Sequence, residues 1–239
     1  MRDIKADLLS NPGLYHYLRQ ILTGGMPFDR WVELYGLDDP AERIADIGCG
    51  PSDVLRYVGR GSRPDFYVGI DLSQRYLDVA EKRARRLDLD SEFIRMDLDR
   101  LYTDAALQRE LTETLEKHRI TRVLLLGVLH HISDDACLAT LNLAHEVATV
   151  DSVVTSDVLY LPGRTLNNLL CDWDRGGFVR DEQGYDDLVR SSSWPSHRKA
   201  FTHPGFSFIT YVHYLLSRPT ELDTGRGSAG APDPVAEPD

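Results

Sequence analysis

Short polar motifs directly follow several apolar runs of the sequence, and their residue types suit a ligand that contains a nucleoside. Gly48 and Gly50 end the run at 43–48 and open the next stretch. Glycine lets the backbone turn tightly there and lets a ligand approach without a Cβ in the way. Asp71 ends the next run, 21 residues after Gly50. At about this spacing an acid accepts both hydroxyls of a ribose.

The charges beside the glycines favour one class of nucleoside ligand. The third glycine of a dinucleotide fingerprint would stand at position 53, which is Asp53. A pyrophosphate would then meet a carboxylate at a helix N-terminus, which is electrostatically unfavourable. S-adenosylmethionine has no phosphate, and its ammonium and sulfonium groups suit carboxylates such as Asp46 and Asp53. We therefore expect the sulfonium cofactor rather than a dinucleotide.

Alternating apolar runs and amphipathic stretches must position these residues. The expected strands are 43–48, 66–71, 92–97, 123–128 and 152–158, and the expected helices are 52–59, 73–87, 103–118 and 134–149. Ser73 and Ser133 stand where helix N-caps belong. Because parallel neighbours need a crossover, usually a helix, the alternation predicts an α/β fold with a doubly wound, mostly parallel Rossmann-like sheet and helices on both faces.

The flanks of this core have a different composition. Aromatic and aliphatic residues at helical spacing over 11–36 predict two short helices and an N-terminal helical cover at 1–41. In the main domain, 42–218, the segment 160–200 is interpreted as a substrate-side insertion before a last strand at 206–216. Residues 219–239 hold four prolines and five acids against one arginine, so we expect a disordered tail.

Composition limits the partners and the compartment. The 239 residues carry 27 Lys+Arg against 38 Asp+Glu, a formal charge of -11, which argues against nucleic acid or an acidic membrane surface as the partner. The longest apolar run, 123–129, is far short of a membrane span. Three cysteines without CxxC spacing fit a reducing cytoplasm. We expect a cytoplasmic monomer or homodimer that acts on a small-molecule acceptor.

Four motifs in order carry a resemblance to a known family. They are RIADIGCGP at 43–51, YVGIDLS at 67–73, IRMDL at 94–98 and LLGVLHHISDD at 125–135. Together they resemble the successive motifs of class I S-adenosylmethionine-dependent methyltransferases over residues 42–158. Pro51 and Ser52 replace a glycine that is often found in the first motif. NPGLY near the start and DRGGFVR at 174–180 are similar to small bacterial members of secondary or envelope metabolism.

The resemblance implies a place for each motif residue. Asp46, Gly48 and Gly50 would surround the methionine part and Asp71 would hold the ribose hydroxyls. Leu72 and Met96 would pack beside the adenine, whose amino group would donate to Asp97, and residues 127–129 would lie near the methyl group. The full cofactor-binding set is Asp46, Gly48, Cys49, Gly50, Asp71, Leu72, Met96, Asp97, Leu98, Gly127 and Val128. Asp71 and Asp97 also suit plain capping or surface duty.

His130, His131 and Asp157 are the candidate catalytic residues. Imidazole titrates near neutrality and can take a proton from an acceptor hydroxyl or amine. Packing is an alternative for either histidine, and adjacent histidines without a third ligand do not predict a metal site. Methyl transfer also proceeds by proximity and orientation alone. Tyr160, His203 and the arginines Arg175 and Arg180 stand where they could reach an acceptor.

Other functions fit the same residues. A nucleotide-dependent oxidoreductase shares this architecture, and a protein that retains the cofactor pocket could bind without turnover. A reaction assisted by the sulfonium without methyl transfer is a third alternative. The sequence does not decide whether the acceptor atom is oxygen, nitrogen or carbon, because the recognised core does not build the acceptor pocket.

Overall fold

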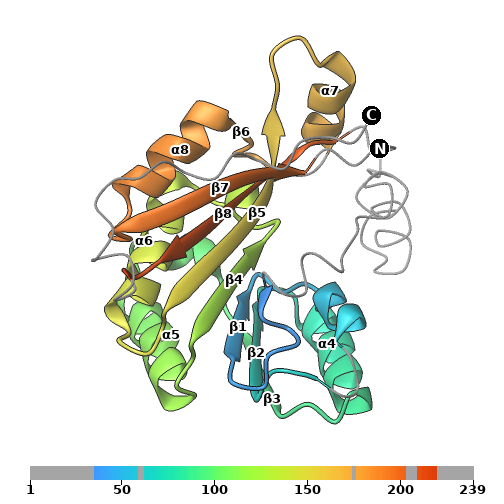
Figure 1. Cartoon of the computed structure of the whole chain (residues 1–239), viewed down its shortest axis with the longest axis vertical. Helices are drawn as coiled ribbons and strands as arrows, with labels where there is room; N and C mark the ends of the chain where they lie inside the picture. Colours follow the sequence, from blue (N-terminus) through green and yellow to red (C-terminus); the bar gives the residue numbers. More distant parts are fainter. Residues whose placement is uncertain (1–34, 59–61, 174–175, 203–208, 220–239) are drawn as a thin grey trace.

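The computed structural model describes residues 35–58, 62–173, 176–202 and 209–219. The two helices expected within 11–36 lie outside the described residues almost entirely, as does the tail expected at 219–239. The described part is built around one mixed β-sheet with helices on both faces (Figure 1).

Five parallel strands form the first part of the sheet. They are β1 (Arg43–Ile47), β2 (Phe66–Asp71), β3 (Ser91–Arg95), β4 (Arg122–Leu126) and β5 (Ser152–Tyr160). They lie in the order β3-β2-β1-β4-β5. Strands β2 and β3 are added on one side of β1, and β4 and β5 are added on its other side, so the strand order switches between β1 and β4. Ligands bind open α/β sheets at such a switch point, beside the carboxyl ends of the strands.

An antiparallel hairpin extends the sheet beyond β5. β8 (Tyr211–Ser217) pairs with β5 and β7 (Ser196–Thr202) pairs with β8, both antiparallel, while the two-residue β6 (Arg180–Asp181) pairs with the end of β5. The mostly parallel sheet is thus confirmed for five strands, and the complete order is β3-β2-β1-β4-β5-β8-β7. The strand expected at 206–216 is β8.

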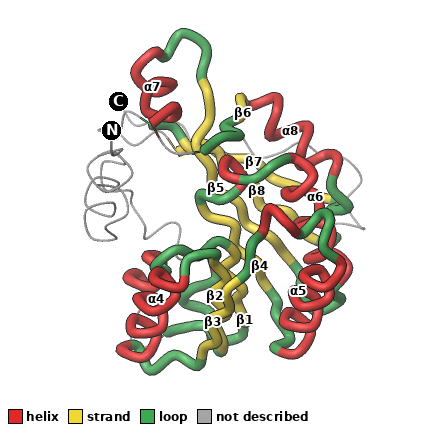
Figure 2. Tube along the Cα trace, turned by 180° about the vertical axis from the view of Figure 1, so that it is seen from behind, coloured by secondary structure: helices red, strands yellow, loops and turns green. Residues whose placement is uncertain are grey.

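The helices divide between the two faces (Figures 1 and 2). α5 (Ala105–Lys117), α6 (Asp134–Glu146) and α8 (Glu182–Ser191) pack on one face, and α4 (Gln74–Arg86) packs on the other. α7 (Thr165–Trp173) stands at the carboxyl end of β5. Ser73 and Ser133 accept hydrogen bonds from the first turns of α4 and α6, as the sequence predicts.

Two segments differ in detail from the pattern read in the sequence. The stretch 52–59 forms only a short 3-10 helix, η1 (Asp53–Tyr57), and not an α-helix. The segment 160–200, interpreted from the sequence as a substrate-side insertion, holds α7, β6, α8 and much of β7. β7 has no apolar run, since it is a strand at the edge of the sheet whose residues 197–201 are exposed.

The sheet separates two apolar clusters. Alternate residues of a strand face opposite sides, so Ala45 and Ile47 join the cluster under α5, α6 and α8, while Ile44 joins the cluster under η1 and α4. Asp46 therefore lies on the same face as Ile44. In the described part of the chain, no helix has the length and apolar character needed to cross a membrane.

The buried histidine of β8 makes the stability of this fold dependent on pH. His213 lies opposite Ser156 of β5 and Ala200 of β7 and is 2% exposed. Burial lowers the pKa of His213 to about 3. The unfolded chain takes up a proton near pH 6.5 that the folded chain does not, so stability falls as pH decreases below about 6.5.

We expect His213→Gln to reduce this pH dependence. Between pH 7 and pH 5 the wild type should lose about 2 kcal/mol more unfolding free energy than the variant. Urea unfolding at both pH values measures the difference, in which the contributions of the other titrating groups cancel. Equal losses in the two proteins would show that His213 takes up its proton as readily in the folded chain as in the unfolded chain.

Candidate cofactor and active site

The loop after β1 depends on backbone conformations that favour glycine. Gly48 and Gly50 have φ of 76° and 53°. A Cβ on Gly48 would lie 2.5 Å from Cγ2 of Val128, so only glycine lets the loops after β1 and β4 approach this closely. A Cβ on Gly50 would meet nothing within 4 Å. Gly50 therefore borders open space at the carboxyl end of β1.

Asp71 ties this loop to the end of β2. Its Oδ2 accepts from the Gly50 N–H and its Oδ1 accepts from the Ser73 N–H, both at 2.8 Å. Burial raises the pKa of Asp71, and the two backbone donors oppose that shift. Each carboxylate oxygen has a second lone pair, so the group still has acceptor capacity for ligand hydroxyls.

The residues expected beside the adenine follow the ends of β2 and β3. Leu72 is 56% exposed, which is unusual for a leucine next to a buried strand and leaves an apolar surface for a flat ring. Met96 is buried and its N–H donates to the Asp71 carbonyl at 3.1 Å. Asp97 is half-buried and caps the short helix η2 (Leu98–Arg100), a role that differs from the surface acid that the sequence left open.

Asp46 lies beneath the glycine loop rather than on its surface. It is 3% exposed, and the hydroxyl of Tyr67 donates to its Oδ2. Ser52, which has a left-handed conformation, contributes a fully buried hydroxyl to the same group. Sequence reasoning missed Tyr67 and Ser52. The polar tip of Tyr67 in an otherwise apolar strand was the available indication.

The loop after β4 carries the two candidate histidines. It contains the short helix η3 (Leu129–His131) and is anchored where the Gly127 N–H donates to the Ser156 carbonyl at 2.7 Å. Gly127, with φ of 73°, and Val128 complete the side of the site that faces Gly48.

His130 and Asp157 form a buried pair, whereas His131 is exposed. Nδ1 of His130 lies 2.7 Å from Oδ1 of Asp157, and the two side chains are 3% and 1% exposed. Because a carboxylate only accepts, Nδ1 carries the proton and Nε2 is the basic nitrogen. Asp157 lies within β5 and not after it. The ring centroid of His131 is 4.1 Å from that of His130.

The segment 176–180 packs against this pair. A Cβ on Gly176 would lie 2.5 Å from Cδ2 of His130, and the Phe178 N–H donates to the His130 carbonyl at 3.0 Å. The connection between α7 and α8 thus covers the ring of His130. This contact was not predicted from the sequence, since the two segments lie more than 40 residues apart.

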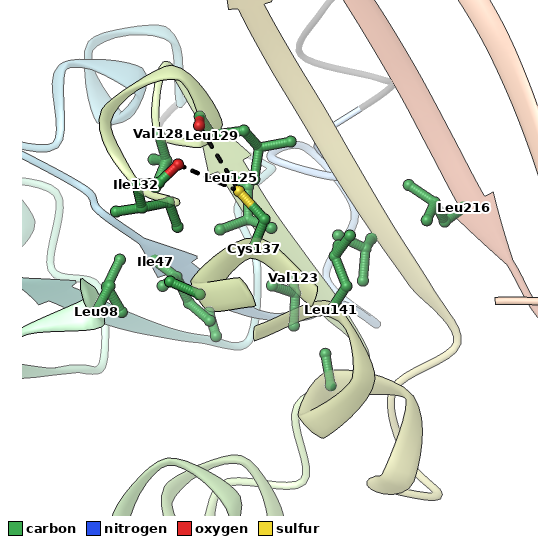
Figure 3. Close-up of a cluster of buried hydrophobic side chains, with 14 of the residues drawn as sticks. Ile47, Leu98, Val123, Leu125, Val128, Leu129, Ile132, Cys137, Leu141 and Leu216 are labelled. Carbon is green, nitrogen blue, oxygen red and sulfur yellow. Dashed lines mark hydrogen bonds between the residues drawn. The ribbon is translucent and has the colours of Figure 1, made fainter. Parts of the chain in front are cut away.

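Arg180 holds the η3 loop and does not face the ligand site. Its guanidinium donates to the carbonyls of Leu129, Ile132 and Phe178 at 2.7, 3.2 and 2.8 Å, and it pairs with Asp134. The carbonyls of Leu129 and Ile132 also accept from the buried thiol of Cys137 (Figure 3). The expectation that Arg180 could reach an acceptor is therefore not supported, because its donors are already used within the protein.

The remaining acceptor candidates are less informative. The Tyr160 hydroxyl donates to Asp172 at 2.7 Å, and this bond raises the pKa of Tyr160 to about 12. His203 and Arg175 lie outside the described residues.

Comparison with known families identifies the core of this site. Residues 44–151 match the model of a family described as a methyltransferase domain. The match spans the glycine loop, Asp71, Asp97 and the η3 loop. No curated protein sequence matches the chain.

Solved structures resemble the fold over most of the chain. A geranyl diphosphate C-methyltransferase from Streptomyces coelicolor A3(2), solved with Mg2+, geranyl-S-thiolodiphosphate and S-adenosyl-L-homocysteine, is 14% identical; the match covers 80% of this chain and 74% of that one, with a TM-score of 0.55. A methyltransferase from Archaeoglobus fulgidus is 11% identical over 85% and 100% of the chains, with a TM-score of 0.58. A cyclopropane synthase from Mycobacterium tuberculosis is 13% identical over 80% and 82%, with a TM-score of 0.57. At these identities the likeness is one of fold.

The Arg180 contacts predict a large stability effect. We expect Arg180→Ala to lower the unfolding free energy by roughly 2–3 kcal/mol, because it leaves the carbonyls of Leu129 and Ile132 with only the weak thiol donor of Cys137. Arg190→Ala is the matched control, since Arg190 in α8 is 56% exposed and lies 3.4 Å from each of its partners, Asp186 and Asp187. It should cost less than about 0.5 kcal/mol. If denaturant titration gives similar losses of unfolding free energy for both variants, the hydrogen bonds of Arg180 to the η3 loop do not make this contribution.

Proposed function

Because the chain carries a class I S-adenosylmethionine-dependent methyltransferase domain, we propose that it transfers a methyl group from S-adenosylmethionine to a small molecule and releases S-adenosylhomocysteine. The observation that carries the proposal is the convergence of Gly50, Asp71, Leu72 and the η3 loop at the carboxyl edge of one sheet. Three separate chain segments meet there, in the order that the resemblance implies.

The residues at this edge fit the cofactor. The open side of Gly50 leaves room for a ligand against the loop. Asp71 supplies acceptor capacity for ribose hydroxyls, and the exposed Leu72 supplies an apolar surface for the adenine. Asp46 places a carboxylate under the loop, on the side where the charged methionine end would lie. We assign these roles as proposals for the individual residues.

The bound cofactor supplies an activated methyl group on a sulfonium, so the protein mainly needs to orient the acceptor. We propose that Asp157 fixes the tautomer of His130 and that Nε2 of His130 takes the proton of an acceptor hydroxyl or amine. Both side chains of the pair are buried, and Gly176 and Phe178 lie against His130. His131, which is exposed, is the second candidate for contact with the acceptor.

Charge and the structural relatives support a small acceptor. The formal charge of -11 disfavours a polyanionic acceptor such as nucleic acid. The printed name of one relative specifies geranyl diphosphate, and another relative is a plantazolicin methyltransferase solved with a desmethyl analogue of that compound. We propose a comparable low-molecular-weight acceptor in secondary metabolism. Three free, buried cysteines support a reducing, cytoplasmic location.

Calorimetric titration tests the cofactor without knowledge of the acceptor. The purified protein should bind S-adenosylmethionine and S-adenosylhomocysteine and should not bind a nicotinamide dinucleotide. Cofactor that co-purifies is removed first by unfolding and refolding or by extensive dialysis. Binding of the dinucleotide alone would favour the oxidoreductase alternative.

Turnover separates an enzyme from a binding protein that retains the pocket. With methyl-labelled cofactor and pools of cell-derived metabolites, we expect a labelled small molecule to form together with S-adenosylhomocysteine. Persistent binding without any labelled product from those pools would favour the non-catalytic alternative.

Asp71→Ala tests the ribose assignment. We expect it to weaken cofactor binding by roughly 1–3 kcal/mol, because it removes a charged acceptor from buried hydroxyls. Asp78→Ala, at an exposed acid on α4, is the matched control and should leave affinity unchanged. Unchanged affinity in Asp71→Ala would remove Asp71 from the ribose site.

A further inference from the structure

A single buried hydroxyl group joins the two ends of the glycine loop. Tyr67 of β2 is fully buried, and its Oη lies 2.5 Å from Oδ2 of Asp46 and 2.9 Å from Oγ of Ser52. Asp46 is the last residue but one of β1, before the loop, and Ser52 is the residue before η1, at the end of the loop. The phenol therefore closes the loop from beneath, on the face of the sheet that η1 and α4 cover.

The direction of the proton in this group follows from its chemistry. A carboxylate only accepts, so Tyr67 donates its proton to Asp46, and the hydroxyl of Ser52 donates to Tyr67. Burial, with a contribution from the charge of Asp46, raises the pKa of Tyr67 well above its ordinary value. Burial likewise raises the pKa of the neighbouring Cys49 thiol. Tyr67 therefore keeps its proton and donates it to the carboxylate of Asp46.

The hydrogen bond from Tyr67 fixes the position of the Asp46 charge. Oxygen–oxygen distances near 2.5–2.7 Å are typical of bonds from a hydroxyl to a carboxylate. A buried carboxylate that loses its donor is strongly destabilised, so it turns toward another donor or takes up a proton. Either change would move the negative charge away from the space under the loop.

We propose that Tyr67 is a positioning residue for the charged methionine end of the cofactor, acting through Asp46. The inference rests on the proposed function. It divides ligand recognition between two carboxylates at neighbouring strand ends. Asp46, held by Tyr67, acts on the amino-acid end, while Asp71, held by the Gly50 and Ser73 N–H groups, acts on the ribose.

A truncated ligand separates these two roles. 5′-Methylthioadenosine keeps the adenine, the ribose and a neutral thioether, but it lacks the amino-acid group. In Tyr67→Phe we expect the affinity for S-adenosylmethionine and S-adenosylhomocysteine to fall about 10-fold or more. The affinity for 5′-methylthioadenosine should stay within about 2-fold of the wild type, whereas Asp71→Ala should weaken all three ligands.

The outcomes of this calorimetric experiment are distinct. An equal loss for all three ligands in Tyr67→Phe would overturn the proposal, because it would mean that the hydroxyl only maintains the loop. Unchanged affinity for all three would overturn it as well. If the wild type binds none of the three ligands, the proposed function itself fails, and this result is separate from any effect of the variant.

A control and a double variant complete the test. Tyr214→Phe removes the same kind of bond, from a buried tyrosine to Asp186 at 2.6 Å, away from the glycine loop, and should leave all three affinities unchanged. Asp46→Asn should reproduce the selective loss by itself, whatever the stability of Tyr67→Phe. Adding Tyr67→Phe to Asp46→Asn should then weaken the binding of S-adenosylmethionine by less than about 2-fold further. Full additivity of the two losses would show that Tyr67 does not act through Asp46.

Discussion

The carboxylate of Asp71 connects three parts of the chain that must meet for a ligand site to exist. Its two oxygens accept from the N–H groups of Gly50 and Ser73, which joins the end of β2 to the loop after β1 and to the start of α4. The carbonyls of Ile70 and Asp71 accept from the same loop and from Met96 after β3. One strand end thus aligns the ends of its two neighbours, and the space beside Gly50 is a consequence of that alignment.

Two acids at this edge, the buried Asp46 and the half-buried Asp71, have different surroundings. Asp71 is held by backbone donors, which any sequence supplies once the loop has its shape. Asp46 is held by the side chains of Tyr67 and, through it, Ser52. The first arrangement depends on the fold and the second on particular residues, so the second is where members of one fold can differ in how they bind the charged end of a ligand.

The acceptor side is built by long-range contacts of the η3 loop. Gly176 and Phe178 lie against His130, and Arg180 donates to carbonyls on both sides of it. A guanidinium that satisfies several carbonyls makes this loop and the connection from α7 to α8 one structural unit. The segment 160–200 was interpreted from the sequence as lying on the substrate side. Its residues 176–180 also hold His130, which is the proposed base for the acceptor.

The sequence alone determined the five parallel strands, their helices, the Ser73 and Ser133 caps and the four motifs of the domain. Each of these depends on local periodicity, on a cap or on glycines at a turn, and such features are read over a few neighbouring residues. Only the tertiary structure decided the roles of Tyr67 and Arg180, the pairing of His130 with Asp157 and the existence of β7. Tyr67 meets Asp46 across 21 positions and Arg180 meets Leu129 across 51, and nothing in the local pattern states which distant group a side chain will reach. β7 was hidden for a related reason, since an edge strand with exposed residues has little apolar pattern to detect.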